Sequence, residues 1–174
     1  VIDVKVDRDK PVCGNNNGST SWTKSDRTIN QECSDAISGC TKDTFPKTFS
    51  ATTKVGEVVI TDNAGNTETC KPNVYVDKTA PTCGKTSGES KTWTNSKRTI
   101  KQYCSDSHSG CSADYFSDSW SSTKKTSTIT IKDKVGNTKK CDVNVYVDTT
   151  DPTCKPKNST TSTNNSSSGV TGHM

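Results

Sequence analysis

The sequence predicts an all-β protein made of two tandem modules, and two observations lead to this class. Apolar and polar residues alternate wherever a regular pattern occurs, as at Val58 and Ile60 or at Ile129 and Ile131, which is the period of a half-buried strand. The chain also repeats itself: 33 of the 64 residues from 19 to 82 are identical to their counterparts from 90 to 153. No segment shows the period of an amphipathic helix.

The composition indicates how such modules stay folded. The 174 residues include no leucine, and only 26% of them are hydrophobic, which would ordinarily indicate disorder. However, nine cysteines recur at fixed positions, and modules of about 70 residues usually need cross-links because their cores are small. We therefore expect disulfide bonds and an oxidising, extracellular location, either secreted or at the cell surface.

Each module begins with a strand-rich half that contains three of its four cysteines. Residues 27–33 and 98–104 alternate as strands, with Ile29, Gln31 and Cys33 on one face of the first. The segments from Cys33 to Cys40 and from Cys104 to Cys111 have the Ser, Asp and Gly content of turns.

Each module is expected to end in a hairpin and a short linker. The turns at residues 62–66 and 133–137 contain Gly and Asn, which tolerate the positive φ of a tight turn. After the second turn, one face of the returning strand is apolar; its residues are Cys141, Val143, Val145 and Val147. A Pro-Thr-Cys sequence then opens the next unit, at residues 81–83 and again at 152–154.

These features define the module boundaries. Module 1 covers residues 8–77 and module 2 covers residues 78–148, while residues 149–154 open a truncated third module. Residues 1–7 are either the end strand of a preceding module or a first strand. Residues 155–174 are expected to form a flexible, disordered tail rich in Ser, Thr and Asn, which ends in Gly172–Met174, a sequence typical of a cloning remnant.

The two ends of each module resemble the hyalin-repeat (HYR) domain and the wider set of bacterial immunoglobulin-like surface repeats. The resemblance rests on Asp-x-x-x-Pro-x-Cys at the start, on the D-x-x-G-N turn, and on C-x-x-x-V-x-V at the end. It implies immunoglobulin-like β-sandwiches, an extracellular adhesive role, and a disulfide between the first and last cysteines of a module. The middle pair, Cys33 and Cys40 in module 1, is not part of that pattern.

Four cysteines in a module allow three connectivities. With the first and last paired as the resemblance implies, the expected disulfides are Cys13–Cys70, Cys33–Cys40, Cys83–Cys141 and Cys104–Cys111, and Cys154 remains a free thiol. Zinc is the competing interpretation. We disfavour zinc because the close cysteines lack both the usual C-x-x-C spacing and aligned histidines.

One loop of module 2 contains the residue types of a hydrolase triad, since Ser105, Asp106, Ser107, His108 and Ser109 follow one another. Module 1 has Ile37 in place of His108 and Ala36 in place of Ser107. A loop that accepts either set is expected to be solvated surface, so we predict no catalytic residue.

Aromatic residues are the candidates for binding. Three tryptophans could stack on sugar rings, but a core position is favoured because two of them recur with the core pattern: Trp22, Trp93 and Trp120. Three tyrosines lie opposite the apolar faces of their strands and are candidate ligand contacts: Tyr75, Tyr103 and Tyr146.

Four aspartates beside turns and linkers could bind calcium at module junctions: Asp62, Asp77, Asp133 and Asp148. Aspartate also caps its own backbone in turns, which is the simpler interpretation, so no metal or other cofactor is expected. The net charge of +4 is spread along the chain and gives no reason to expect nucleic acid as a partner. No apolar run is long enough for membrane insertion of this fragment.

Together these observations predict a non-catalytic extracellular structural or adhesive repeat, a stalk or spacer whose linkers and disulfides limit bending and extension. The expected partners are neighbouring immunoglobulin-like modules of the same chain, and a host or cell-surface protein or glycan. The alternative is a carbohydrate-binding accessory module of a secreted glycan-degrading enzyme.

Overall fold

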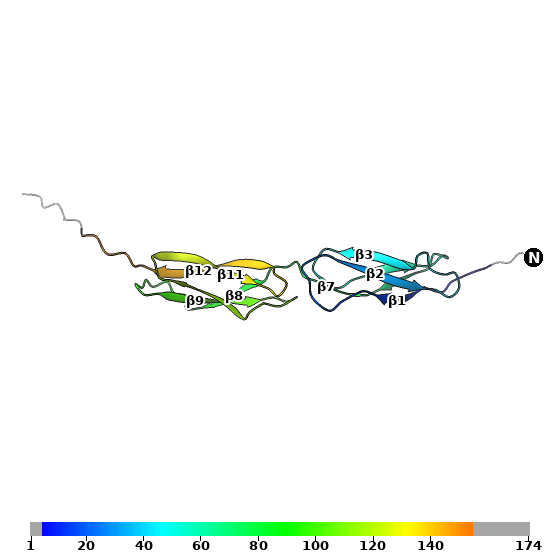
Figure 1. The fold of residues 1–174 in the computed structure, drawn as a ribbon, viewed down its shortest axis with the longest axis horizontal. Helices are drawn as coiled ribbons and strands as arrows, with labels where there is room; N and C mark the ends of the chain where they lie inside the picture. Colours follow the sequence, from blue (N-terminus) through cyan, green and yellow to red (C-terminus); the bar gives the residue numbers. More distant parts are fainter. Residues whose placement is uncertain (1–4, 155–174) are drawn as a thin grey trace, which may run out of the picture.

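The computed structural model describes residues 5–154, which contain twelve strands and no helix (Figure 1). The predicted all-β class is confirmed. All paired strands have their partners within residues 8–77 or within residues 78–148. Figure 1 shows these two groups of strands end to end, joined by one short linker. Residues 5–154 contain no helix long and apolar enough to cross a membrane.

Module 1 contains seven strands in three small sheets. The first sheet is antiparallel and has the order β1 (Val12–Asn16), β2 (Arg27–Ser34), β3 (Thr44–Phe49). Two further antiparallel pairs follow: β4 (Thr53–Val55) with β7 (Asn73–Val76), and β5 (Val58–Thr61) with β6 (Thr67–Cys70).

Module 2 has the same first sheet, but its remaining residues form one sheet of two long strands. Its first sheet has the order β10 (Tyr115–Trp120), β9 (Arg98–Ser105), β8 (Thr82–Ser87), and its second consists of β11 (Lys124–Lys132) and β12 (Thr138–Val147). Module 1 has Pro72 where β12 has Val143. Because proline has no backbone N–H, it interrupts the ladder and leaves two short pairs where module 2 has one long hairpin.

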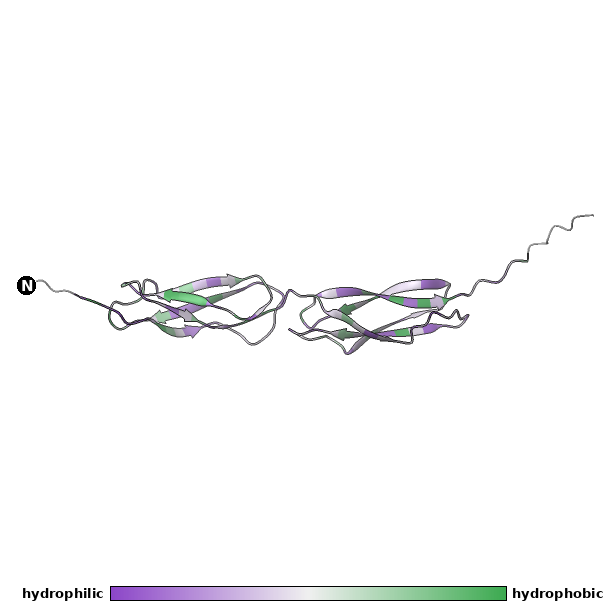
Figure 2. Ribbon diagram, turned by 180° about the vertical axis from the view of Figure 1, so that it is seen from behind, coloured by the Kyte–Doolittle hydropathy of each residue, from purple (hydrophilic) through white to green (hydrophobic). Residues whose placement is uncertain are grey.

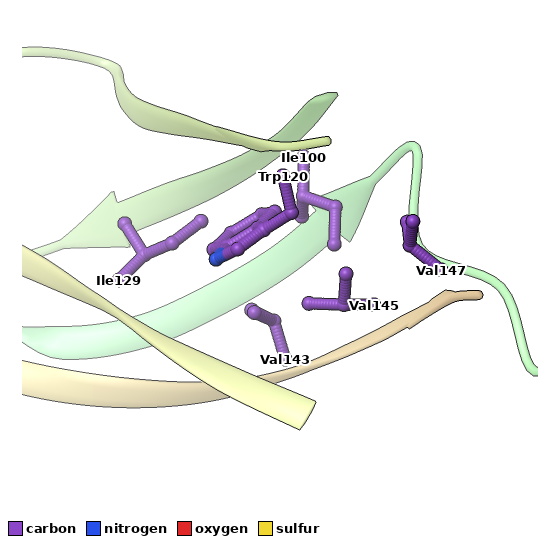
Figure 3. Close-up of a cluster of buried hydrophobic side chains, with 6 residues drawn as sticks. All are labelled: Ile100, Trp120, Ile129, Val143, Val145 and Val147. Carbon is purple, nitrogen blue, oxygen red and sulfur yellow. The ribbon is translucent and has the colours of Figure 1, made fainter. Parts of the chain in front are cut away.

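In each module the first sheet forms one layer and the remaining strands form the other, and a small core lies between them. In module 2 it comprises residues of β9, β10, β11 and β12: Ile100, Trp120, Ile129, Val143, Val145 and Val147. Figure 3 shows the Trp120 ring between the side chains of Ile129 and Ile100. Figure 2 shows that the hydrophobic segments are short and lie within strands that are otherwise polar. The predicted alternation along β12 is confirmed, because its four apolar residues are all buried.

Module 1 places Ile29, Val58, Val74 and Val76 in the equivalent core, with Phe45 and Phe49 packed against them. Phe49 stands where module 2 has Trp120. The ring of Phe49 lies against Gly56, where a Cβ atom would be 2.3 Å from its Cζ. Glycine at this position therefore makes room for the aromatic ring.

Four disulfides cross-link the modules internally, and they join the pairs expected from the sequence. The long bridges Cys13–Cys70 and Cys83–Cys141 connect β1 to β6 and β8 to β12, across separations of 57 and 58 residues. The short bridges Cys33–Cys40 and Cys104–Cys111 close loops across a separation of 7 residues. Cys154 is a free and exposed thiol. Four disulfides indicate an oxidising environment.

The structure corrects the expected positions of two tryptophans. Trp120 lies in the core, but Trp22 is only half-buried and Trp93 is 50% exposed. Both precede the strands β2 and β9, and the residue after each forms a parallel bridge at the C-terminal end of its module: Thr23 with Val76, and Thr94 with Val147. They therefore lie at module ends, outside the core.

The ends of the chain carry little regular structure. Lys5, Val6 and Asp7 belong to no strand, and neither do residues 149–154. The remainder of the predicted N-terminal strand, at residues 1–4, and the predicted tail, at residues 155–174, lie outside the described residues.

Candidate functional site: the junction between the modules

The linker aspartate Asp77 is the centre of the junction. It is fully buried, and its carboxylate Oδ2 accepts the backbone N–H of Ser109 at 3.1 Å. Its other oxygen, Oδ1, accepts the N–H of Thr79 at 2.9 Å. The side-chain amide of Asn137 donates to the backbone carbonyl of Asp77 at 3.1 Å. We call the aspartate, serine and asparagine of this arrangement the aspartate latch.

The same latch occurs where the N-terminal linker enters module 1. Oδ2 of Asp7 accepts the N–H of Ser38 at 3.1 Å, and Oδ1 accepts the N–H of Asp9 at 2.9 Å. The Asn66 amide donates to the Asp7 carbonyl at 3.5 Å. Each module therefore holds the linker that precedes it through the same three residue positions.

The short disulfide loop orients the serine of the latch. In module 2, Oδ1 of Asp106 accepts the N–H groups of His108 at 3.1 Å and of Gly110 at 2.7 Å, which caps the loop from within. Gly110 adopts a positive φ of 81°, a conformation that glycine reaches without strain. The Cys104–Cys111 bridge closes the loop. The Ser109 N–H is thereby left free to bind the linker carboxylate.

The D-x-x-G-N turn orients the asparagine of the latch. Asp133 is fully buried, and its Oδ2 accepts the side-chain amide of Asn137 at 2.7 Å. The same amide group reaches the linker carbonyl, so Asn137 bridges the turn and Asp77. The sequence correctly predicts the turn but does not reveal that its asparagine binds the linker. The recurrence of Asn66 and Asn137 in both modules is the one sequence signal that could have revealed this role.

An aromatic pair covers the C-terminal end of each module. The rings of Trp22 and Tyr75 lie 4.9 Å apart, and those of Trp93 and Tyr146 lie 5.0 Å apart. Both tyrosines have a positive φ, 50° for Tyr75 and 49° for Tyr146, which is uncommon for a residue with a side chain. This backbone conformation recurs in both modules together with the tilted aromatic pair, so it is a regular feature of the module end.

Three further contacts join the end of module 1 to the following unit. The rings of His108 and Trp22 form a T-shaped pair, with their centroids 6.0 Å apart. The Lys24 ammonium group donates to the Gly136 carbonyl at 3.3 Å. Lys78, next to the linker aspartate, forms an ion pair with Asp26 at 2.5 Å. Since Asp26 is half-exposed, this pair contributes little to stability.

The electrostatics of the latch favour an ionised linker aspartate. Burial opposes ionisation of Asp77, but the hydrogen bonds from Ser109 and Thr79 outweigh it, so the pKa of Asp77 is lowered. The pKa of Asp7 is also lowered, chiefly by its hydrogen bonds with Ser38 and Asp9. Both linkers therefore carry a negative charge at neutral pH.

The four aspartates considered for calcium are not all brought together. Asp62 lies in a cluster with Asp7 and Asp35, and Asp77 lies in a cluster with Asp106 and His108, in each case with candidate ligand atoms within 4.8 Å of one another. Within residues 5–154, Asp133 and Asp148 join neither cluster. The carboxylates of Asp62 and Asp133 accept hydrogen bonds from their own turns, which is the capping role expected of them.

The loop with triad-like composition belongs to the junction. Ser107 Oγ lies 3.4 Å from Nδ1 of His108, but the Asp106 carboxylate bonds the loop backbone. His108 is exposed, as expected, whereas Ser109 is buried against the linker. The expectation of a solvated loop is therefore wrong for Ser109, because the linker covers it.

The three candidate tyrosines lie at two different places. Tyr75 and Tyr146 are half-buried in the aromatic pairs at the module ends. Tyr103 lies on the outer face of β9 beside Tyr115, with 5.8 Å between the ring centroids. Tyr115 is 42% exposed and was not among the residues predicted from the sequence.

No protein-family model matches this chain, and no curated protein or solved structure matches it either, so the latch, the aromatic pairs and the disulfides carry the functional argument.

Proposed function

We propose that the chain is a pair of immunoglobulin-like β-sandwich modules, with HYR-like ends, from a non-catalytic extracellular stalk or spacer. The two-layered, disulfide-linked architecture supports the fold assignment, and the disulfides support a secreted or cell-surface location. The expected neighbours are further modules of the same kind. A host or cell-surface protein or glycan is the expected ligand.

The observation that carries this proposal is the aspartate latch. A linker that served only as a connection would need no buried side chain. Here the linker aspartate is bonded through its carboxylate to a loop and through its carbonyl to a turn of the following module. Because two separate segments hold one residue, the linker is fixed in direction as well as in position.

The long disulfides support a mechanical role in a second way. In module 1, tension entering at Asp7 reaches Cys13 after six residues, and the Cys13–Cys70 bridge passes it to the end of β6, from which β7 leads out of the module. The force therefore passes through the disulfide, and the residues between these two cysteines do not bear it. An oxidised module therefore cannot be pulled out to the full length of its chain.

The test compares how the two modules tumble in the native chain and in two variants. We expect backbone ¹⁵N relaxation to give one common rotational correlation time for modules 1 and 2. Replacing the latch residue, Asp77→Ala, is expected to shorten the correlation times, because each module then tumbles more independently. Asp118→Ala removes an exposed aspartate of β10 and is the matched control.

Two results would contradict the proposal. Independent tumbling of the modules in the native protein would show that the latch does not fix the junction. Unchanged tumbling in Asp77→Ala would show that other contacts do. In either case the stalk assignment loses its main support.

A further inference from the structure

The outer face of the first sheet of module 2 carries an aromatic and basic cluster. Tyr103 of β9 lies directly opposite Tyr115 of β10, and their rings are 5.8 Å apart at an angle of 53°. The Lys85 ammonium lies 5.1 Å from the centre of the Tyr103 ring, and the Lys101 ammonium lies 4.3 Å from that of Tyr115. We call these four residues the Lys–Tyr face.

The remainder of this surface consists of hydroxyl groups. Alternation along the strands directs Thr99 outward with Lys101 and Tyr103, and directs Ser117 and Ser119 outward with Tyr115. Thr99 and Ser119 share a hydrogen bond of 2.7 Å. No outward position of β9 or β10 carries a carboxylate, and within residues 5–154 neither lysine of the face forms a salt bridge. The positive charge of the surface is therefore not neutralised by the protein.

The fold does not require this cluster, because module 1 lacks it. The positions of Lys85, Lys101, Tyr103 and Tyr115 are occupied in module 1 by Asn15, Asn30, Glu32 and Thr44. The strands of module 1 nevertheless pair in the same register, with Glu32 opposite Thr44. A sheet-stabilising role alone would apply equally to both modules, so the difference indicates a role specific to module 2.

We propose that the Lys–Tyr face is a binding surface for an anionic polysaccharide, one that carries carboxylate or sulfate groups. The two ammonium groups attract the acidic groups of such a chain, and the phenol and hydroxyl groups of the face bond to its sugar hydroxyls. The face of a three-stranded sheet suits an extended chain. This proposal goes beyond the stalk function and does not depend on it.

The composition of the face favours a glycan over an acidic protein. Protein–protein interfaces usually have an apolar core. The outward positions of β9 and β10 include no aliphatic side chain, and the tyrosines that stand there combine an aromatic ring with a polar hydroxyl group. An acidic protein would find little apolar surface to bury on this face.

The test measures binding of the native chain to immobilised heparin as a sulfated probe, to polygalacturonate as a carboxylated probe, and to neutral dextran. We expect binding to at least one acidic polysaccharide and none to dextran, with affinity that falls as salt screens the charges. The double variant Lys85→Asn and Lys101→Asn is expected to bind at least about tenfold more weakly.

The control variant removes the same charge elsewhere in module 2. Lys139→Asn and Lys140→Asn lie on the exposed start of β12. If the control weakens binding as much as the face variant does, the attraction is a general effect of net charge and the proposal fails. It also fails if no acidic polysaccharide binds, or if polyglutamate binds more tightly than either acidic polysaccharide, which would assign the face to an acidic protein.

A variant designed to gain binding provides an independent test of the proposal. Module 1 receives the Lys–Tyr face through four substitutions: Asn15→Lys, Asn30→Lys, Glu32→Tyr and Thr44→Tyr. We expect this variant to bind acidic polysaccharide more tightly than the native chain. The two tyrosines alone, Glu32→Tyr and Thr44→Tyr, are expected to give a smaller increase. Circular dichroism melting confirms that each variant is folded, and unchanged binding by the folded four-residue variant would overturn the proposal.

Discussion

The carboxylate of Asp77 accepts the backbone N–H of Ser109, a residue 32 positions further along the chain, at 3.1 Å. Asp77 ends module 1, whereas Ser109 lies in a disulfide-closed loop of module 2, so this bond is made across the boundary. Asp148 occupies the same position at the end of module 2, where no such loop follows in the described residues, and it is exposed. Asp7, which is bound by module 1, is half-buried, so the following module contributes to the burial of a linker aspartate.

Acidification is expected to release the latch. The pKa of Asp77 is lowered from its ordinary value of 3.8, so its contribution to stability is complete above that value and is lost as the pH falls through the lowered pKa. We predict that the modules tumble together at neutral pH and down to the ordinary pKa of 3.8, and that they separate only as the pH falls through the lowered pKa of Asp77. NMR titration of the Asp77 carboxyl and the Ser109 amide tests this, and parallel changes in both signals are expected.

Replacement of His108 should affect the junction but not the fold. The His108 ring is exposed and forms a T-shaped pair with Trp22, so His108→Ala is predicted to change the free energy of unfolding by less than about 0.5 kcal/mol. The indole N–H resonance of Trp22 is expected to shift, whereas that of Trp93 stays in place. Loss of any enzymatic activity in this variant would disprove the non-catalytic assignment.

The long and short disulfides should differ in their contribution to stability. Removing Cys83–Cys141 frees a loop closed over 58 residues, and we predict a loss of about 4 kcal/mol, which is enough to unfold a module of this size. Removing Cys104–Cys111 frees a loop closed over 7 residues and is predicted to cost about 2.5 kcal/mol. Denaturant unfolding of the two double alanine variants measures both. Equal losses would contradict the loop-entropy argument.

Cys154 is predicted to be the one reactive thiol. It is free and exposed, whereas the other eight cysteines are paired. Alkylation under denaturing, non-reducing conditions should add one label per chain, and peptide mapping should place it on Cys154. Oxidised samples are expected to contain a reducible dimer that disappears in Cys154→Ser. A label on any other cysteine would refute the disulfide assignment.

Gly56 is predicted to tolerate no side chain. Its Cβ would lie 2.3 Å from Cζ of Phe49, so Gly56→Ala forces the ring to move and is expected to cost about 1–3 kcal/mol. The counterpart of Gly56 in module 2 is Ser127, so Ser127→Ala is the matched control and should be close to neutral. Thermal melting of the two variants tests this prediction. An unchanged Tm for Gly56→Ala would show that the core adapts to the added methyl group.

The local pattern predicted much of the fold, because alternation and turn chemistry act over a few residues. The apolar faces of β5, β11 and β12 and the turns at Gly65 and Gly136 follow from them directly. The position of Trp93 did not follow, because repetition alone cannot separate a core residue from one repeated at every module end. Only the pairing of Thr94 with Val147 places it there.

The candidate site was harder to predict, because its bonds join distant segments. Asn137 and Asp77 are 60 residues apart, and the acceptor of their hydrogen bond is a backbone carbonyl. Every residue has such a carbonyl, so the residue type at position 77 does not predict the contact. The Lys–Tyr face was missed for a related reason. Tyr103 was identified on its own strand, but its partner Tyr115 becomes visible only once β9 and β10 are in register.

The recurrence of the latch has a geometric consequence. Asp7 and Asp77 bind the following module through the same atoms, so each module is placed on its linker in the same way. Objects joined by one repeated rotation and translation trace a helix. A longer run of such modules would therefore form a regular superhelix, and any surface repeated in every module would appear at a constant angular step along it. A surface confined to one module, as the Lys–Tyr face is here, would instead point in a single direction from the axis of the superhelix.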